Sequence, residues 1–131
     1  MKKILLLIFF SFFCYLEALS PQNLHASFLL ADCGREEEAK EILINSFSRK
    51  TADVEFIAEQ FVNWIRNQPT EMEENFNRSA YFVVKGNKNL AKKAITNFHS
   101  LEHNQLSEFA TTFVDWGFNL LETYEVLTQS R

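Results

Sequence analysis

The sequence holds few residues that break helices or cross-link a chain. Among its 131 residues there are three Gly, two Pro and two Cys. So little Gly and Pro argues against linkers, low-complexity tracts and a sheet with many turns. The sequence also has no phosphate-binding glycine loop, nucleophile elbow or paired-cysteine metal motif. What remains is typical of a small helical protein without one of the common catalytic signatures.

The sequence also lacks a large excess of either basic or acidic residues. The chain has 13 basic and 17 acidic residues, a net charge of −4. A mildly acidic protein has no general attraction for nucleic acid or for an anionic membrane. Acidic residues cluster only at 36–38 and 71–74, where we expect solvated helix starts. We therefore expect no nucleic-acid partner.

The N-terminal segment, residues 1–20, differs from the rest. A basic start at residues 1–3 precedes an apolar run over 4–13, interrupted by Ser11, and a more polar stretch over 17–20. This layout predicts a secretory signal peptide over residues 1–20. The run is too short for a comfortable membrane span, which needs about 20 apolar residues. We expect a secreted or periplasmic protein that meets the membrane only transiently; the alternative is membrane attachment through an uncleaved N-terminus.

Two cleavage positions compete, after Ala18 or after Ser20. Leu16 is large for its position before Ala18, whereas Pro21 would hinder cutting after Ser20. Either product keeps Cys33 as its only cysteine, so an internal disulfide is impossible. At a helix C-terminus the dipole does not activate a thiol, and we expect Cys33 to be buried and structural.

The chain repeats itself at an offset of 52 residues, which aligns 23–67 with 75–119 without a gap. Twelve of those 45 positions are identical, whereas chance would give roughly three. A fixed period predicts units that share a core. We expect one domain over residues 21–131, with units at about 21–70 and 71–131. The identical pairs are Asn23/Asn75, Ser27/Ser79, Gly34/Gly86, Ala39/Ala91, Lys40/Lys92, Asn45/Asn97, Ser48/Ser100, Ala58/Ala110, Phe61/Phe113, Val62/Val114, Trp64/Trp116 and Asn67/Asn119.

Each unit is predicted to hold three helices. The first spans 23–33 or 75–85 and stops at a glycine, and the second spans 36–47 or 88–98. The third is capped by Thr51 or Asp53 in the first unit and ends before Pro69. Its counterpart meets no proline and should run to about Leu127. Residues 81–84 have strand-like propensity, yet the repeat predicts helix there. The fold class is all-α: two tandem three-helix repeats stacked as a short α–α array.

Glycine, four residues and alanine occur twice, at Gly34–Ala39 and Gly86–Ala91. This pattern resembles the turn between the two helices of tetratricopeptide-type repeats, where the small alanine lets the second helix pack closely. The resemblance implies helix stacking and partner binding. The period of 52 differs from that family's 34, and the family's unit has no third helix. No functional residue is therefore carried over.

One short string is similar to a metal motif. Residues His99 to His103 read H-S-L-E-H, like the H-x-x-E-H of inverted zinc metallopeptidases, in which two histidines hold zinc and Glu102 would activate water. A third ligand must come from elsewhere. The repeat aligns this string with residues 47–51, a connection between helices. We favour a polar connector and expect no cofactor, with a zinc-dependent hydrolase as a remote alternative.

The matched Trp64 and Trp116 support two interpretations. Core packing is favoured, but both lie one step off the main apolar stripe and could anchor a partner. Gly117 stands where the first unit has Ile65, which leaves a notch beside Trp116. Phe56 stands opposite Glu108 in the repeat and breaks the symmetry on a surface that a partner could cover.

These patterns predict an exported, non-catalytic helical-repeat protein that binds a protein or peptide partner, or a second copy of itself. Two units alone would leave apolar ends exposed, which favours a homodimer. The alternative is a carrier of a small apolar ligand in a closed cavity lined by Phe61, Phe109 and Phe113. Asn77 begins a glycosylation sequon, Asn-Arg-Ser.

Overall fold

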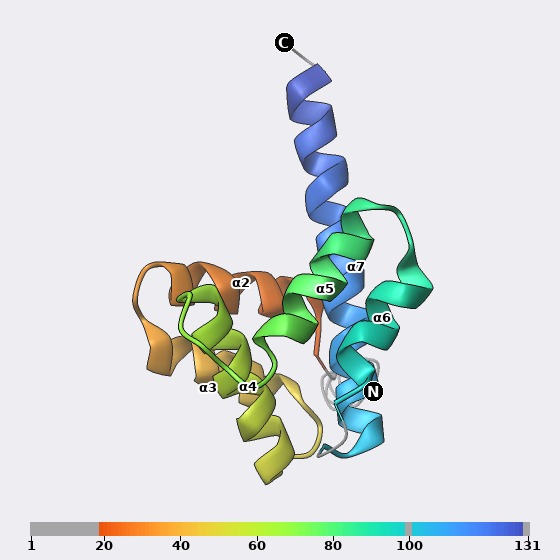
Figure 1. Ribbon diagram of the computed structural model, residues 1–131. Helices are drawn as coiled ribbons and strands as arrows, with labels where there is room; N and C mark the ends of the chain where they lie inside the picture. Colours follow the sequence, from red (N-terminus) through yellow and green to blue (C-terminus); the bar gives the residue numbers. More distant parts are fainter. Residues whose placement is uncertain (1–18, 99–100, 130–131) are drawn as a thin grey trace, which may run out of the picture.

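The computed structural model describes residues 19–98 and 101–129, and helices joined by short connections make up this part of the chain, without a strand (Figure 1). The predicted all-α class is confirmed. Residues 1–18 of the predicted signal peptide, and His99, lie outside the described residues. No described helix has the length and apolar character needed to cross a membrane. The described residues form the helices α2 (Pro21–Asp32), α3 (Glu36–Ser46), α4 (Ala52–Ile65), α5 (Glu73–Val84), α6 (Lys88–Thr96) and α7 (His103–Gln129).

Local sequence explains where these helices begin. The side chains of Ser20, Thr51 and Asn87 accept hydrogen bonds from backbone N–H groups in the first turns of α2, α4 and α6. Each side chain thereby satisfies a donor that the helix itself leaves unpaired. The predicted Thr51 cap is confirmed. Pro21 stands in the first turn of α2, where its missing N–H is not needed.

The predicted glycine stops are also confirmed. Gly34 follows α2 with φ 88° and Gly86 follows α5 with φ 79°, the left-handed region that glycine enters without steric strain. Asn67, at φ 61°, turns the chain after α4 and ahead of Pro69. These three positions lie just beyond the ends of α2, α5 and α4.

The element bounds follow the offset found in the sequence. Helices α2 and α5 begin and end at positions that the repeat aligns with each other, and α3 and α6 begin at aligned positions. Helix α7 starts just before the position aligned with the start of α4 but continues to Gln129, because no proline interrupts it. Residues 81–84 are helical, as predicted. The second half of α7 projects beyond the other helices (Figure 1).

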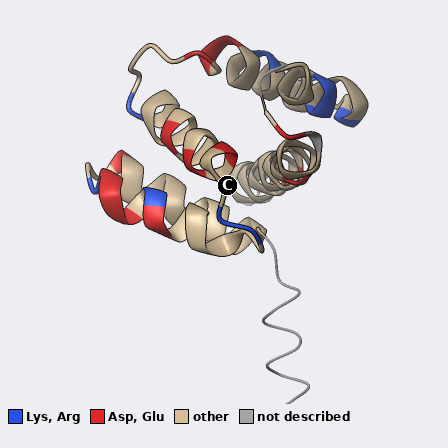
Figure 2. Ribbon diagram, turned by 90° about the horizontal axis from the view of Figure 1, so that it is seen from below, with Lys and Arg blue, Asp and Glu red and all other residues tan. Residues whose placement is uncertain are grey.

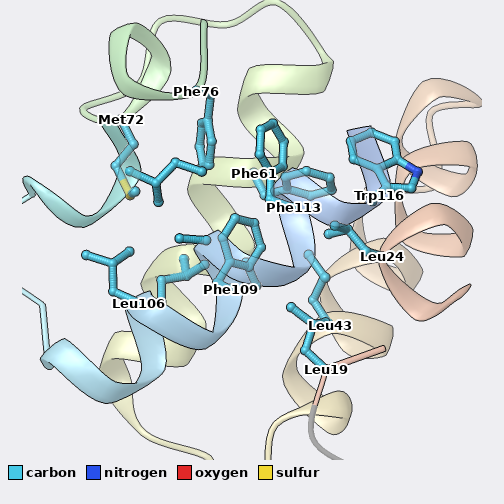
Figure 3. Close-up of a cluster of buried hydrophobic side chains, with 14 of the residues drawn as sticks. Leu19, Leu24, Leu43, Phe61, Met72, Phe76, Leu106, Phe109, Phe113 and Trp116 are labelled. Carbon is cyan, nitrogen blue, oxygen red and sulfur yellow. The ribbon is translucent and has the colours of Figure 1, made fainter. Parts of the chain in front are cut away.

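The core lies where α4 and α7 meet. Helix α2 packs on α3, α4 and α7, and α5 packs on α4, α6 and α7. Four phenylalanine rings form its centre (Figure 3), and ring centroids within this group lie 5.6–6.3 Å apart. Burying each such ring contributes about 1.5–3 kcal/mol. They are Phe61, Phe76, Phe109 and Phe113.

Two buried serines tie neighbouring helices together. The Ser27 hydroxyl donates to the carbonyl of Ala39 over 2.9 Å, and the Ser79 hydroxyl donates to the carbonyl of Ala91 over 2.7 Å. Both serines are fully buried, so these bonds remove the penalty of an unpaired polar group.

The prediction that Cys33 is buried is wrong. Cys33 is exposed at the C-terminal cap of α2, whereas Ala31, two residues earlier, is fully buried. An exposed cap residue gains nothing from burial, so this thiol has no packing role.

Candidate functional site

An apolar groove of about 480 Å³ runs between α5 and the projecting half of α7, with the end of α4 at one side. Nearly all of its lining is hydrocarbon or aromatic. Such a surface binds apolar side chains well and offers few groups for hydrogen bonding. The groove is lined by Trp64, Ala80, Val83, Val84, Phe113, Trp116, Gly117, Leu120, Leu121 and Tyr124.

Three aromatic rings make up one side of the groove. The Phe113 ring centroid lies 5.6 Å from that of Trp64 and 5.6 Å from that of Trp116. Trp116 is only 6% exposed, whereas Trp64 is half-buried. Trp116 belongs to the buried core cluster, as core packing predicts, and both rings border the groove. That the tryptophans anchor a partner stays a prediction.

Hydrogen bonds fix the two indoles in place. The Trp116 Nε1–H donates to Nδ1 of His25 over 3.0 Å, and the Trp64 Nε1–H donates to Oδ1 of Asn77 over 2.7 Å. With its N–H already paired, each indole presents mainly its apolar ring to the groove. A partner that covers the rings would not leave an indole donor unpaired.

Gly117 brings α7 close to α5. A Cβ atom at Gly117 would lie 3.1 Å from Cγ1 of Val83, which is tighter than an ordinary contact. Val83 takes up much of the space that the sequence predicted as a notch at Gly117. The glycine therefore sets the depth of the groove and the approach of its two walls.

Large apolar side chains at the rim face solvent. Val84 is 68% exposed and Tyr124 is 67% exposed, with Leu120 at 39%. Among the described residues that line the groove, Tyr124 supplies the only ionisable group. This lining thus lacks a carboxylate, imidazole or amine for acid–base chemistry.

The structure brings together three of the four predicted partner-binding residues. Trp64, Trp116 and Gly117 all line the groove. Phe56 does not; it is half-buried and stacks on Phe98, with ring centroids 5.7 Å apart. Sequence reasoning predicted a helix that runs to about Leu127, a span that includes Leu120, Leu121 and Tyr124. It missed that they have no covering helix, although the greater length of α7 was the available signal.

The predicted connector at the zinc-like string lies between α6 and α7. The Glu102 backbone N–H donates to Oδ2 of Asp53 over 3.0 Å, so this turn is tied to the start of α4. Among residues 19–98 and 101–129, no group of three His, Cys, Asp or Glu side chains is placed to hold a metal. Nothing there adds to the metal alternative.

A second, polar pocket of about 250 Å³ lies near this turn. Glu108 borders it and is half-buried, and desolvation by burial raises the pKa of its carboxyl, against a smaller lowering by a hydrogen bond from the Leu19 N–H. Sequence reasoning noted Glu108 only as the counterpart of Phe56. The pocket is lined by Phe47, Ser48, Arg49, Glu102, Asn104, Gln105 and Glu108.

Comparison with known proteins leaves the site to be interpreted on its own geometry. No protein-family model, curated protein or solved structure matches the chain.

Proposed function

We propose that the chain is an exported, non-catalytic binding protein whose apolar groove takes a helix of a protein partner. The groove between α5 and α7 is the observation that carries this proposal, because rigid aromatic rings border one side of it and exposed apolar side chains form its rim. Aromatic anchors in a rimmed groove are typical of surfaces that bind an apolar helix face. A partner's Leu or Phe side chains would fill the space beside Gly117.

Two three-helix units are the architecture that we propose for this chain. The matching bounds of α2 and α5 under the sequence offset, and the matched serine bonds to Ala39 and Ala91, support it. The Gly-x4-Ala turns keep the tetratricopeptide-like resemblance as part of the proposal. The indole bonds run from each third helix to the first helix of the other unit, which favours two facing units over an open stack.

Export is the second part of the proposal. Its support is the basic start, apolar run and polar stretch of residues 1–20. Secretion or transfer to a periplasm would place the groove where extracellular or envelope proteins can reach it. Retention of the leader would instead hold the same groove at a membrane surface.

Charge favours a second copy of the chain as the partner. Residues 103–129 hold four acidic residues and no Lys or Arg, whereas residues 79–101 hold four lysines and no Asp or Glu. Lys85 caps the end of α5 and Lys88 begins α6, and neither forms an ion pair within the described residues. Figure 2 shows the basic segments in blue and the acidic segments in red. An α7 from a second copy, lying along the groove, would bring Glu122 and Glu125 toward these lysines.

The two other functions receive less support. The rings of Phe61, Phe109 and Phe113 contact one another and fill the space that an enclosed ligand would need. This packing disfavours the carrier. The zinc-dependent hydrolase would need His99, which lies outside the described residues. Our proposal therefore assigns no catalytic role to the chain.

Site-specific photo-crosslinking tests the groove. A photoreactive residue is placed at Leu121, inside the groove, and in a control chain at Val126, which lies on the opposite face of α7 and is 66% exposed. The exported protein is irradiated where it is produced, and the adducts are identified by mass spectrometry. We expect a defined protein adduct, including the dimer, from position 121 only. Equal labelling from both positions would contradict the proposal.

A further inference from the structure

The backbone at Leu19 is part of the fold. Its N–H donates to Oε1 of Glu108 over 3.3 Å, and its carbonyl accepts a hydrogen bond from the Thr112 hydroxyl over 3.4 Å. The side chain is 8% exposed and belongs to the buried core cluster (Figure 3). Leu19 is therefore held at three points, although 89 residues separate it from Glu108.

Ser20 is fixed as well. Its hydroxyl accepts a hydrogen bond from the Asn23 N–H over 3.2 Å and caps α2, and its carbonyl accepts from the Leu24 N–H over 3.0 Å. A chain that lacked residues 19 and 20 would lose this cap and the buried Leu19 side chain together. Both losses destabilise the first helix and its packing.

Glu108 has no cationic partner among the described residues. It is half-buried and forms no ion pair there. The sequence offset aligns Glu108 with Phe56, so a carboxylate stands at only one of the two matching positions. A half-buried carboxylate without a cation is unfavourable, and a positive group at the Leu19 nitrogen would remove that penalty.

We propose that a leader peptidase cuts between Ala18 and Leu19, and that the new α-ammonium of Leu19 forms an ion pair with Glu108. Water adds across the peptide bond: Ala18 leaves as a carboxylate, and the Leu19 nitrogen becomes an ammonium at neutral pH. This inference rests on the export part of the proposed function. It resolves the choice between the two cleavage positions in favour of the one that retains Leu19 and Ser20.

The surroundings suit a buried chain terminus. The nitrogen lies 3.3 Å from Oε1 of Glu108 before cleavage, within reach of a charge-assisted hydrogen bond. On its other side Glu108 borders the polar pocket of about 250 Å³, so its carboxylate can keep contact with water while Oε1 pairs with the terminus. The Leu19 side chain and the Thr112 bond would keep the terminus in place.

The first test determines the N-terminal residue of the exported protein. The full chain is produced with its own leader in a secreting host, and the product is read by intact mass and N-terminal sequencing. A product that begins at Leu19 is expected. A product that begins at Pro21 or elsewhere overturns this inference but leaves export standing, whereas a retained leader removes both.

The ion pair is tested on the same exported product. We expect the α-amino pKa, followed by NMR after isotopic methylation, to lie above the ordinary range of about 7.7–8.0 and to return to it in Glu108→Gln. The matched control is Glu102→Gln, an exposed carboxylate at the same pocket. An α-amino pKa that is ordinary in the wild-type product, or unchanged by Glu108→Gln, would overturn the pairing. If Glu108→Gln is not exported in folded form, the wild-type pKa alone decides.

Discussion

The indole of Trp116 in α7 donates to His25 in α2 over 3.0 Å, and this bond has a counterpart elsewhere in the chain. Trp64, the repeat counterpart of Trp116, donates to Asn77, which the same offset aligns with His25. The donor helix of each proposed unit thus holds the first helix of the other. In an open array, only one such contact could form between two units. The pair of bonds therefore supports two units that close on each other.

Replacing Trp116 by Phe should destabilise the protein by about 1–2 kcal/mol, because the bond to His25 is lost and a small void remains beside the Phe28 ring. Trp64→Phe is the matched control and should have a smaller effect, since its bond to Asn77 lies at the surface. Urea unfolding of both variants gives the comparison. An equal loss in the two variants would contradict the structural role assigned to Trp116.

Ser27→Ala and Ser79→Ala should each lower the free energy of unfolding by about 1 kcal/mol, because each serine donates one buried hydrogen bond to a neighbouring helix. The two serines occupy matching positions, so the two losses should be similar. They should also add in the double variant, since no partner is shared. A large loss at one position and none at the other, measured by denaturant unfolding, would argue against equivalent units.

Gly86 and Gly117 should respond differently to replacement by alanine. Gly86 has φ 79° and open space around it, so Gly86→Ala should destabilise by about 1–2 kcal/mol through backbone strain alone. Gly117 lies inside α7, where alanine has the better helix propensity, by about 1 kcal/mol. The 3.1 Å approach to Val83 offsets that gain, and we expect Gly117→Ala to be nearly neutral. Thermal unfolding would distinguish the two, and a stabilising Gly86→Ala would contradict the left-handed turn.

The stability of the folded protein should depend on pH through Glu108. The sign of this dependence differs between a chain in which Leu19 is internal and one in which Leu19 is the N-terminus. When Leu19 is an internal residue, burial raises the pKa of Glu108 above its ordinary value of 4.5. The folded state then holds the proton more tightly, so stability is full below pH 4.5 and falls as pH rises through the raised pKa. With an ammonium at Leu19 the sign reverses, because the carboxylate becomes the favoured form. Arg49 and Glu102, the other charged groups at this pocket, are present in both cases.

The check is the pH dependence of urea unfolding for the chain with its leader and for the exported product. Glu108→Gln should remove the pH-dependent term from both. If the two chains lost stability over the same pH window, the terminal nitrogen would not act on Glu108.

Much of the helical framework could be predicted from local sequence. Gly34 and Gly86 determine helix ends through backbone conformation alone. Pro69 follows α4, whereas the sequence offset aligns it with Leu121, so no proline interrupts α7. The repeat also identified residues 81–84 as helical despite their strand propensity. These features depend on backbone preferences of neighbouring residues or on comparison of two segments of the same chain. A single sequence contains both kinds of information.

The features that were missed depend on contacts across the fold. The exposure of Cys33 follows from how α2 turns against the core, which local pattern does not reveal. Phe56 was expected at an exposed surface, but Phe98 of the other unit packs on it. The bond from Leu19 to Glu108 joins positions 89 residues apart, and no periodicity connects them. The sequence repeat singled out Trp64, Trp116 and Gly117 through their matching positions. No pattern in the sequence indicated that α5 forms the other wall of the groove.

Sedimentation of the exported protein across a concentration series tests the groove as a protein-binding surface most directly. Wild type is compared with Leu120→Asp and Tyr124→Asp in the groove and with Val126→Asp on the opposite face, under reducing conditions that exclude a disulfide through exposed Cys33. We predict a wild-type dimer at micromolar concentration that added salt weakens, that either groove variant abolishes and that Val126→Asp retains. A wild-type monomer at high micromolar concentration would contradict the second copy as the partner. If Leu121 also gave no protein adduct, the groove would have no role as a binding surface.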